Sequence, residues 1–174
     1  MTDVTIRAAA LADIAAITRI YADAVMHGTA TFELDPPDEA EMARRMTALL
    51  EGGFPYLAAE IGGALVGYAY AGHYRARPAY RFTVEDSIYI DAKAQRRGVG
   101  RALLTRLIEE CERRGFRQMV AVIGDSAQHA SIEVHRALGF RSAGNFENVG
   151  FKFGRWLDSV MMQRELGPGA TTIP

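Results

Sequence analysis

Eight consecutive residues, Gln95 to Ala102, carry the clearest sign of chemistry in this sequence. They read Gln-Arg-Arg-Gly-Val-Gly-Arg-Ala, between strand-like Ser87–Ile90 and helix-like Ala102–Ile108. The glycines let the backbone approach a ligand closely, and the first amides of the following helix have no acceptor within that helix. Because these amides lie at the positive end of a helix dipole and beside arginine side chains, the segment is suited to bind phosphate.

The glycine spacing differs from that of the two familiar nucleotide-binding loops. A Walker loop continues with Lys and Ser or Thr after its second glycine, whereas Arg101 and Ala102 follow here. A dinucleotide-binding loop needs a third glycine where this chain has Leu103. The remaining pattern is Gln-x-x-Gly-x-Gly, and an ordinary strand–turn–helix junction stays open as the alternative.

Periodicity predicts the helices that position this loop. Apolar side chains at helical spacing predict a helix starting near Leu11, and Asp38 is the expected N-cap of a second helix over residues 39–50. A third helix is expected from Gly100 to about Arg114, and a short fourth one over Ser131–Leu138. The apolar positions of the first helix are Ile14, Ile17, Ile20, Tyr21 and Val25.

Seven segments are expected to be strands, two of them joined as a hairpin through Gly62 and Gly63. Nearly continuous apolar character predicts that Met119–Ile123 is buried on both faces. Mixed hairpin and helical connections predict an α/β domain, with a mixed central sheet of about seven strands and about four flanking helices. We expect one domain over 1–166 and a flexible tail over 167–174. The expected strands are 4–7, 56–61, 64–71, 83–90, 119–123, the segment from Phe140 onward and 156–163.

Composition limits the class of protein. The chain has 174 residues, a formal net charge of −1 and 49% hydrophobic residues, as in a single globular domain without a basic nucleic-acid-binding surface. No apolar run approaches the ~20 residues that span a bilayer, and the N-terminus has no apolar signal core. One cysteine excludes an internal disulfide. We therefore expect a cytoplasmic protein that binds neither nucleic acid nor membranes.

The loop pattern and the order of elements resemble the GNAT superfamily of N-acetyltransferases along essentially the whole chain. Thr83–Ile90 and Gly150–Asp158, with the segment His135–Phe140, are similar to segments of phosphinothricin and methionine sulfoximine acetyltransferases. The resemblance implies the GNAT fold, acetyl-CoA as co-substrate, no metal, a homodimer and resistance to antibiotic- or herbicide-like amino acids. For the homodimer, the apolar strand Leu157–Met162 is a candidate interface.

The resemblance assigns the cofactor-binding residues to three segments. The loop would hold the pyrophosphate, and the edge of the preceding strand would pair with the pantetheine amides. Gln128 stands where relatives usually carry an asparagine, and its amide can make the same hydrogen bonds from one carbon further away. The expected residues are Ile88, Tyr89, Ile90, Gln95, Arg96, Arg97, Gly98, Val99, Gly100, Arg101 and Gln128.

Transfer of an acetyl group to an amine needs a base for the amine and a proton for the departing thiolate. With the resemblance, Glu85 is the candidate base, and its alternative is an ordinary salt-bridged glutamate. His135 is the candidate proton donor, and its alternative is a core histidine. Cys111 shares a face with core leucines, so direct attack by the amine is expected instead of a covalent acetyl-enzyme. No pair among the histidines has metal-ligand spacing.

The expected acceptor is a small amino-acid-like amine, whose carboxylate guanidinium groups can bind bidentately. Arg75 and Arg81 are the expected clamp, and a solvated charged loop is the alternative. Two rival functions stay open: acetylation of another amine, such as a protein N-terminus, and an acyl-CoA sensor without turnover. The expected substrate-binding residues are Arg75, Arg77, Tyr80, Arg81, Phe32, Lys152 and Phe153.

Overall fold

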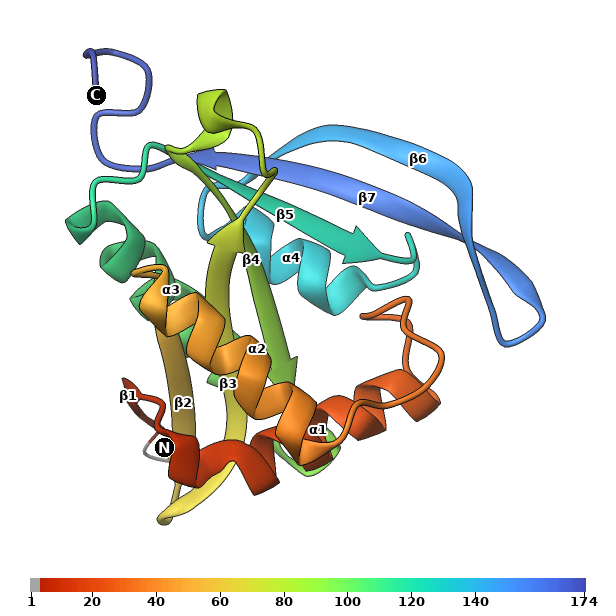
Figure 1. Cartoon of the computed structure of the whole chain (residues 1–174). Coiled ribbons are helices and arrows are strands. Elements are labelled where there is room, and N and C mark those ends of the chain that lie inside the picture. Colours follow the sequence, from red (N-terminus) through yellow and green to blue (C-terminus); the bar gives the residue numbers. More distant parts are fainter. Residues whose placement is uncertain (1–3) are drawn as a thin grey trace.

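A computed structural model describes residues 4–174 of the chain. Residues 1–3, which belong to the expected domain 1–166 and to the segment examined for a signal core, lie outside the described residues. Seven strands form one sheet in the order β1-β2-β3-β4-β5-β7-β6 (Figure 1). The strands are β1 (Val4–Ala8), β2 (Tyr56–Ile61), β3 (Ala64–His73), β4 (Thr83–Ile90), β5 (Gln118–Gly124), β6 (Arg141–Lys152) and β7 (Arg155–Glu165).

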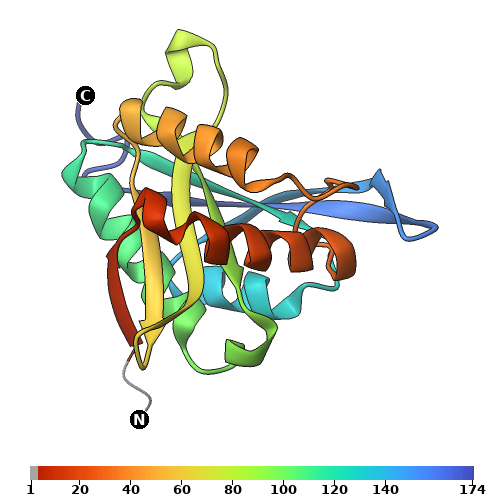
Figure 2. The same ribbon diagram turned by 60° about the horizontal axis from the view of Figure 1, so that its bottom comes forward.

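Four α-helices cover the two faces of this sheet. Helices α1 (Ile14–His27) and α2 (Glu39–Glu51) pack on one face, and α3 (Val99–Arg113) and α4 (His129–Ala137) pack on the other (Figure 2). Three short 3-10 turns complete the order: η1 (Leu11–Asp13), η2 (Pro78–Tyr80) and η3 (Ala92–Ala94). The predicted mixed α/β class and element order are confirmed.

Local sequence accounts for the helices as predicted. All five apolar positions expected to face the core in α1 are buried. The Asp38 carboxylate accepts a hydrogen bond from the amide of Glu41 and so caps α2, and Gly115 ends α3 with a positive φ of 82°. On α3, Leu103, Leu104 and Leu107 are fully buried, each contributing roughly 1.5–3 kcal/mol of apolar burial.

The central feature for function is a split between β4 and β5. The two strands pair in parallel from Thr83 opposite Gln118 to Asp86 opposite Ala121, and within residues 4–174 the pairing ends there. On its other side β4 stays paired with β3 as far as Ile90. The second half of β4 therefore keeps one free edge, as the resemblance implied.

The split also corrects one prediction. Met119, Val120, Ala121 and Ile123 are buried, so residues on both faces of the strand are covered, but Val122 is 38% exposed. The prediction fails at Val122 alone, because its side chain borders the opening that separates β5 from β4.

The C-terminal hairpin of β6 and β7 extends away from the helices (Figures 1 and 2). Leu157 and Met162 of β7 are buried in the core, and Val160 and Met161 between them are half-buried. The interface expected on Leu157–Met162 stays a prediction, and β6 is the strand at that edge of the sheet. Leu166 is fully buried, and the tail over 167–174 contains neither helix nor strand.

Candidate active site

A pocket of about 280 Å³ opens where β4 and β5 separate. Its walls come from both strands, from Tyr70 of β3, from α4 and from the loop between α1 and α2. Five of the predicted site residues line it: Glu85, Ile88, Tyr89, Gln128 and His135. The other lining residues are Ala30, Thr31, Tyr70, Asp86, Ser87, Ala121, Val122, Ile123, Gly124 and Ser131.

Neighbouring residues of β4 face opposite sides of the sheet, because side chains alternate along a strand. Tyr89 belongs to the core under α1 and α2, whereas Val84 and Ile88 belong to the core under α3 and α4. By this alternation Glu85 faces α1 and α2, and Asp86 faces α3 and α4.

The Glu85 carboxyl has the properties of a general base near neutral pH. Burial, with the nearby charge of Asp86, raises its pKa to about 7, and the charge of Arg75 partly opposes this shift. A base whose pKa matches the working pH is both deprotonated and basic enough to accept a proton from an amine. This pKa is compatible with the role of base, which stays a prediction for Glu85.

His135 forms a buried pair with Asp86 on the opposite face. Its Nε2 lies 3.0 Å from Oδ2 of Asp86, and its Nδ1 donates to the carbonyl of Ser131 at 2.7 Å. The side chains of His135 and Asp86 are only 5% and 3% exposed. Burial alone lowers the pKa of His135, but the charge of Asp86 and the two hydrogen bonds outweigh burial and raise it.

The glycine loop presents unpaired backbone amides. Within the described part of the chain, the amides from Gln95 to Arg101 donate to no backbone acceptor, and the next one, Ala102, donates to Gly98. Gly98 caps α3 with a φ of 83°, a left-handed conformation that glycine adopts without strain. The side chains of Arg96, Arg97 and Arg101 are exposed around these amides. This is the arrangement that an anion at a helix N-terminus requires.

The side chain of Gln128, expected to contact the cofactor, already makes a hydrogen bond within the protein. Its Nε2 donates to the hydroxyl of Thr29 at 2.9 Å, which ties the N-terminal end of α4 to the loop after α1. Its Oε1 and the second hydrogen of its Nε2 are left for a further partner, so Gln128 can still accept or donate a hydrogen bond in the pocket.

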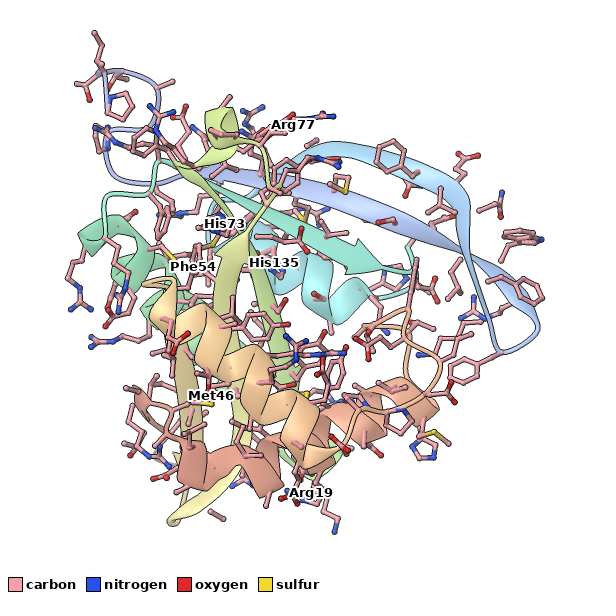
Figure 3. The ribbon with its side chains drawn as sticks, in the orientation of Figure 1. Arg19, Met46, Phe54, His73, Arg77 and His135 are labelled. Atoms are coloured by element: carbon pink, nitrogen blue, oxygen red, sulfur yellow. The ribbon has the colours of Figure 1, made fainter. Side chains whose placement is uncertain are left out.

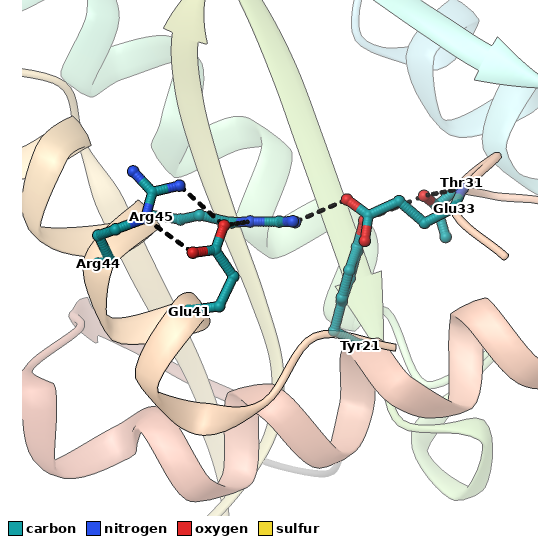
Figure 4. Close-up of polar contacts among 6 residues, drawn as sticks. All are labelled: Tyr21, Thr31, Glu33, Glu41, Arg44 and Arg45. Carbon is teal, nitrogen blue, oxygen red and sulfur yellow. Dashed lines mark hydrogen bonds and ion pairs between the residues drawn. The ribbon is translucent and has the colours of Figure 1, made fainter. Parts of the chain in front are cut away.

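The loop from Gly28 to Asp38, here called the acceptor loop, is fastened over the pocket. The hydroxyl of Tyr21 lies 3.0 Å from that of Thr31, and Arg45 donates to Glu33 at 2.6 Å (Figure 4). Arg45 is held in turn by Glu41 of its own helix (Figure 4). The loop is therefore fixed from both α1 and α2.

Lys152 fastens the same loop from β6. Its Nζ donates to the carbonyls of Gly28 and Thr31, both at 2.9 Å, and the residue is 3% exposed. Burial lowers the pKa of the ammonium group, and the charge of Glu33 partly opposes this. The expectation that Lys152 forms the wall of the substrate pocket is corrected: its ammonium group holds the loop whose Thr31 forms that wall.

Phe32 and Phe153, both predicted to form the wall of the substrate pocket, are not among the described residues that line it. The ring of Phe32 lies against Gly124 and Gly150, so close that a Cβ on Gly150 would come within 2.4 Å of Cε2 of the ring. Phe32 therefore anchors the acceptor loop. Phe153 lies in the turn between β6 and β7, is 55% exposed, and is absent from the pocket lining within residues 4–174.

The basic loop before β4 is exposed. Arg75 is close enough for its charge to lower the pKa of Glu85, whereas Arg81 lies over the ring of Phe82 and donates to the carbonyl of Pro78. Figure 3 shows Arg77 in this loop, between β3 and the start of β4 and away from His135. Arg75 and Arg81 are the expected clamp. Among the described residues, Arg75 is the member of this clamp whose charge acts on Glu85.

Tyr80 packs edge-to-face on Tyr74 with ring centroids 5.6 Å apart, within the same exposed loop.

Burial raises the pKa of Cys111 to about 12, as expected for a core thiol that is no nucleophile. In residues 4–174 no group of three His, Cys, Asp or Glu side chains is arranged to hold a metal ion. None of the helices described has the length and apolar character needed to cross a membrane.

Sequence reasoning missed Asp86, Ser131 and Thr29. Asp86 follows Glu85 directly, and alternation along the strand could have shown that the two carboxyls face opposite sides of the sheet. That His135 would be the partner of Asp86 had no sequence signal, because the two residues are 49 positions apart.

Comparisons with known proteins agree with this architecture. A family model described as an acetyltransferase (GNAT) domain matches residues 6–161. The chain therefore belongs to the GNAT family of acetyltransferases. Within that family it is similar to the phosphinothricin N-acetyltransferase of Alcaligenes faecalis, with 54% identity over 98% of this chain and 86% of the relative.

One further relative and one solved structure are similar to this chain over nearly its whole length. The L-methionine sulfoximine/L-methionine sulfone acetyltransferase of Salmonella typhimurium is 43% identical over 93% of this chain and 94% of the relative. The crystal structure of a GNAT phosphinothricin acetyltransferase from Sinorhizobium meliloti, in complex with acetyl-CoA, superposes with a TM-score of 0.97. That structure is 51% identical and covers 100% of this chain and 94% of the solved one.

Proposed function

We propose that this acetyltransferase moves the acetyl group of acetyl-CoA to the α-amine of a small amino-acid-like acceptor of the phosphinothricin, methionine sulfoximine or methionine sulfone type. The observation that carries the proposal is the pocket in the split, where Glu85 and the His135–Asp86 pair meet the free edge of β4. The relatives named for these acceptors support the choice of substrate class.

The residues present fit acetyl-CoA. The unpaired amides and exposed arginines of Gln95–Arg101 suit the pyrophosphate, and the free edge at Ile88–Ile90 suits the pantetheine amides. Bound there, acetyl-CoA supplies an activated acetyl group as a thioester. Backbone amides on the same edge of β4 would stabilise negative charge on the carbonyl oxygen of the thioester.

The proposed mechanism is direct attack by the amine. Glu85 removes a proton from the acceptor on the α1 and α2 face, either directly or through a water molecule. His135 provides the proton for the sulfur from the α3 and α4 face. Arg75, with Arg77 and Arg81 in the same loop, would attract the carboxylate of the acceptor. Acetylation of amino-acid analogues with antibiotic or herbicide activity would confer resistance to them.

The test is release of free CoA thiol from acetyl-CoA with a panel of acceptors. We expect turnover with phosphinothricin, methionine sulfoximine and methionine sulfone, and none with spermidine, whose positive charges the arginines repel. Turnover with peptide N-termini alone would contradict the proposed acceptor. Acetyl-CoA binding by calorimetry without turnover for any acceptor would indicate a sensor instead.

We also propose that the chain forms a homodimer in the cytoplasm, through the exposed aromatic side chains of the β6–β7 hairpin. Trp156 is 61% exposed and packs edge-to-face on Phe151, with Phe146, Val149 and Phe153 also exposed along the hairpin. Exposed apolar groups gathered this way are typical of interfaces between proteins. The single cysteine is compatible with a reducing compartment.

Trp156→Ser is expected to shift the protein from dimer to monomer in sedimentation velocity, because a buried aromatic side chain often dominates an interface. Leu11→Ser is the matched control, since Leu11 is similarly exposed at 58% but lies at the start of η1. A wild-type monomer, or a Trp156→Ser variant that stays dimeric, would contradict the hairpin interface.

A further inference from the structure

The Asp86–His135 pair holds more protons than either residue would hold alone. A carbonyl oxygen only accepts hydrogen bonds, so the contact with Ser131 requires a hydrogen on Nδ1 of His135. The 3.0 Å contact between Nε2 and Oδ2 requires a second hydrogen, on the imidazole or on the carboxyl group. In both arrangements the pair carries two hydrogens and no net charge.

Removing the second hydrogen would be costly. The Asp86 carboxylate would then face the lone pair of Nε2 at hydrogen-bond distance, with both side chains nearly inaccessible to water. Throughout residues 4–174, Oδ1 of Asp86 also lacks a hydrogen-bond partner, so His135 is the only side chain that stabilises this carboxylate by a hydrogen bond. The two residues therefore bind this proton as one unit.

The surroundings leave few other groups to compete for the proton. Glu85 lies on the other face of β4, and Cys111 of α3 is near enough for the charge of Asp86 to raise its pKa. Strand β5 contributes the apolar Ala121 and Ile123 to the pocket, and Phe140 packs edge-to-face on the imidazole. Asp86 and the Ser131 carbonyl are thus the groups that set the proton content of His135.

We propose that Asp86 is the positioning residue that keeps the second proton on the pair, so that Asp86 and His135 together supply the proton that the departing thiolate takes. The inference rests on the proposed acetyl transfer and deepens it. Asp86 sits at the last paired position of β4 before the split, so the pair lies where the thioester end of a ligand in the split would come to rest.

The proton count balances. The bond between nitrogen and the acetyl carbon forms, the bond between that carbon and sulfur breaks, and the electron pair of the broken bond stays on sulfur. The proton held between Nε2 and Oδ2 moves to sulfur, which leaves the pair with a charge of about −1 and Nδ1 still donating its hydrogen to the carbonyl of Ser131. The acceptor ammonium loses two protons: one restores the pair, and the other is released to solvent through Glu85.

Asp86→Asn tests the proposal with little change in shape. The asparagine amide can donate to a neutral His135 while Nδ1 still donates to Ser131, so the hydrogen bonds survive but the second proton of the acid pair is lost. We expect kcat to fall about 100-fold, the usual scale for loss of a general acid, with unchanged acetyl-CoA affinity. The basic limb of the kcat–pH profile should move to lower pH. Arg136→Gln, on the exposed side of α4, is the control.

A second measurement does not depend on turnover. In the wild-type chain the NMR resonance of the His135 Cε1–H group should show no loss of the pair's second proton up to pH 7, and in Asp86→Asn it should be that of neutral imidazole. Asp86→Asn combined with His135→Gln should lose no more activity than the more impaired single variant, because the two residues act as a unit.

Full kcat in an Asp86→Asn protein whose His135 is neutral would overturn the inference and leave the proposed function intact. Additive losses in the double variant, or a wild-type pair that loses its second proton below pH 7, would also overturn it. A wild-type protein that acetylates no acceptor in the panel would instead remove the proposed function, and this inference with it.

Discussion

Glu85→Gln lowers kcat for acetyl transfer by about 100- to 10,000-fold, the range expected when a general base is removed. Glutamine keeps the size of the side chain but cannot accept the proton of the amine. In the wild-type protein the rate should rise with pH through about 7, as the Glu85 carboxyl loses its proton. The measurement is the pH profile of CoA thiol release at saturating acceptor, and the midpoint near 7 should be absent from the variant.

Thermal unfolding separates this loss from misfolding. Because the pKa of Glu85 is higher in the folded chain than the usual 4.5, its folded form binds the proton more tightly. The contribution of Glu85 to stability is therefore present below about pH 4.5 and is lost as pH rises through about 7. Glu85→Gln should gain in melting temperature relative to the wild type as pH rises over this window. Full activity in Glu85→Gln would remove Glu85 from the role of base.

Lys152→Met is expected to lower kcat/KM for the acceptor by about 10- to 100-fold, the scale of a small misplacement of binding groups. Methionine fills the space but donates no hydrogen bond, so the carbonyls of Gly28 and Thr31 lose their buried partner. Thr31 lines the pocket, and the acceptor loop should therefore become mobile at the wall. Steady-state kinetics with varied acceptor measure the effect, and calorimetry should show unchanged acetyl-CoA binding.

The chain provides a matched control for this variant in its other lysine. Lys93 is exposed on η3, and Lys93→Met should leave acceptor kinetics unchanged. Equal losses in both variants, or loss of acetyl-CoA affinity in Lys152→Met alone, would show that Lys152 does not act through the acceptor loop.

The elements of the fold were predictable because their signals are local. Apolar spacing identified the buried side of α1, and Asp38 and Gly115 marked the ends of helices by backbone chemistry that acts within a few residues. Val122 was mispredicted for a different reason. Its exposure depends on the separation of β4 from β5 after Asp86. The sequence does not show this separation, because an apolar residue fits a closed sheet as well as the border of a split.

The candidate site was predictable in part. Motif resemblance pointed to Glu85, His135 and the glycine loop, and the pocket brings the first two to opposite sides of β4. Lys152 looked like a ligand-binding cation because sequence does not show that loop carbonyls from residues more than 100 positions away would surround it. The pairing of His135 with Asp86 was not predictable for the same reason, because it depends on the tertiary fold.

The alternation along β4 makes the site sensitive to a kind of change that point substitutions do not test. Glu85 and Asp86 are adjacent, and strand register decides which carboxyl faces α1 and α2 and which meets His135. A single-residue insertion between Val84 and Glu85 would move each side chain beyond it to the other face. Two residues inserted there would restore the faces but shift both carboxyls along the split. The length of this strand is therefore as much a determinant of activity as the residues in it.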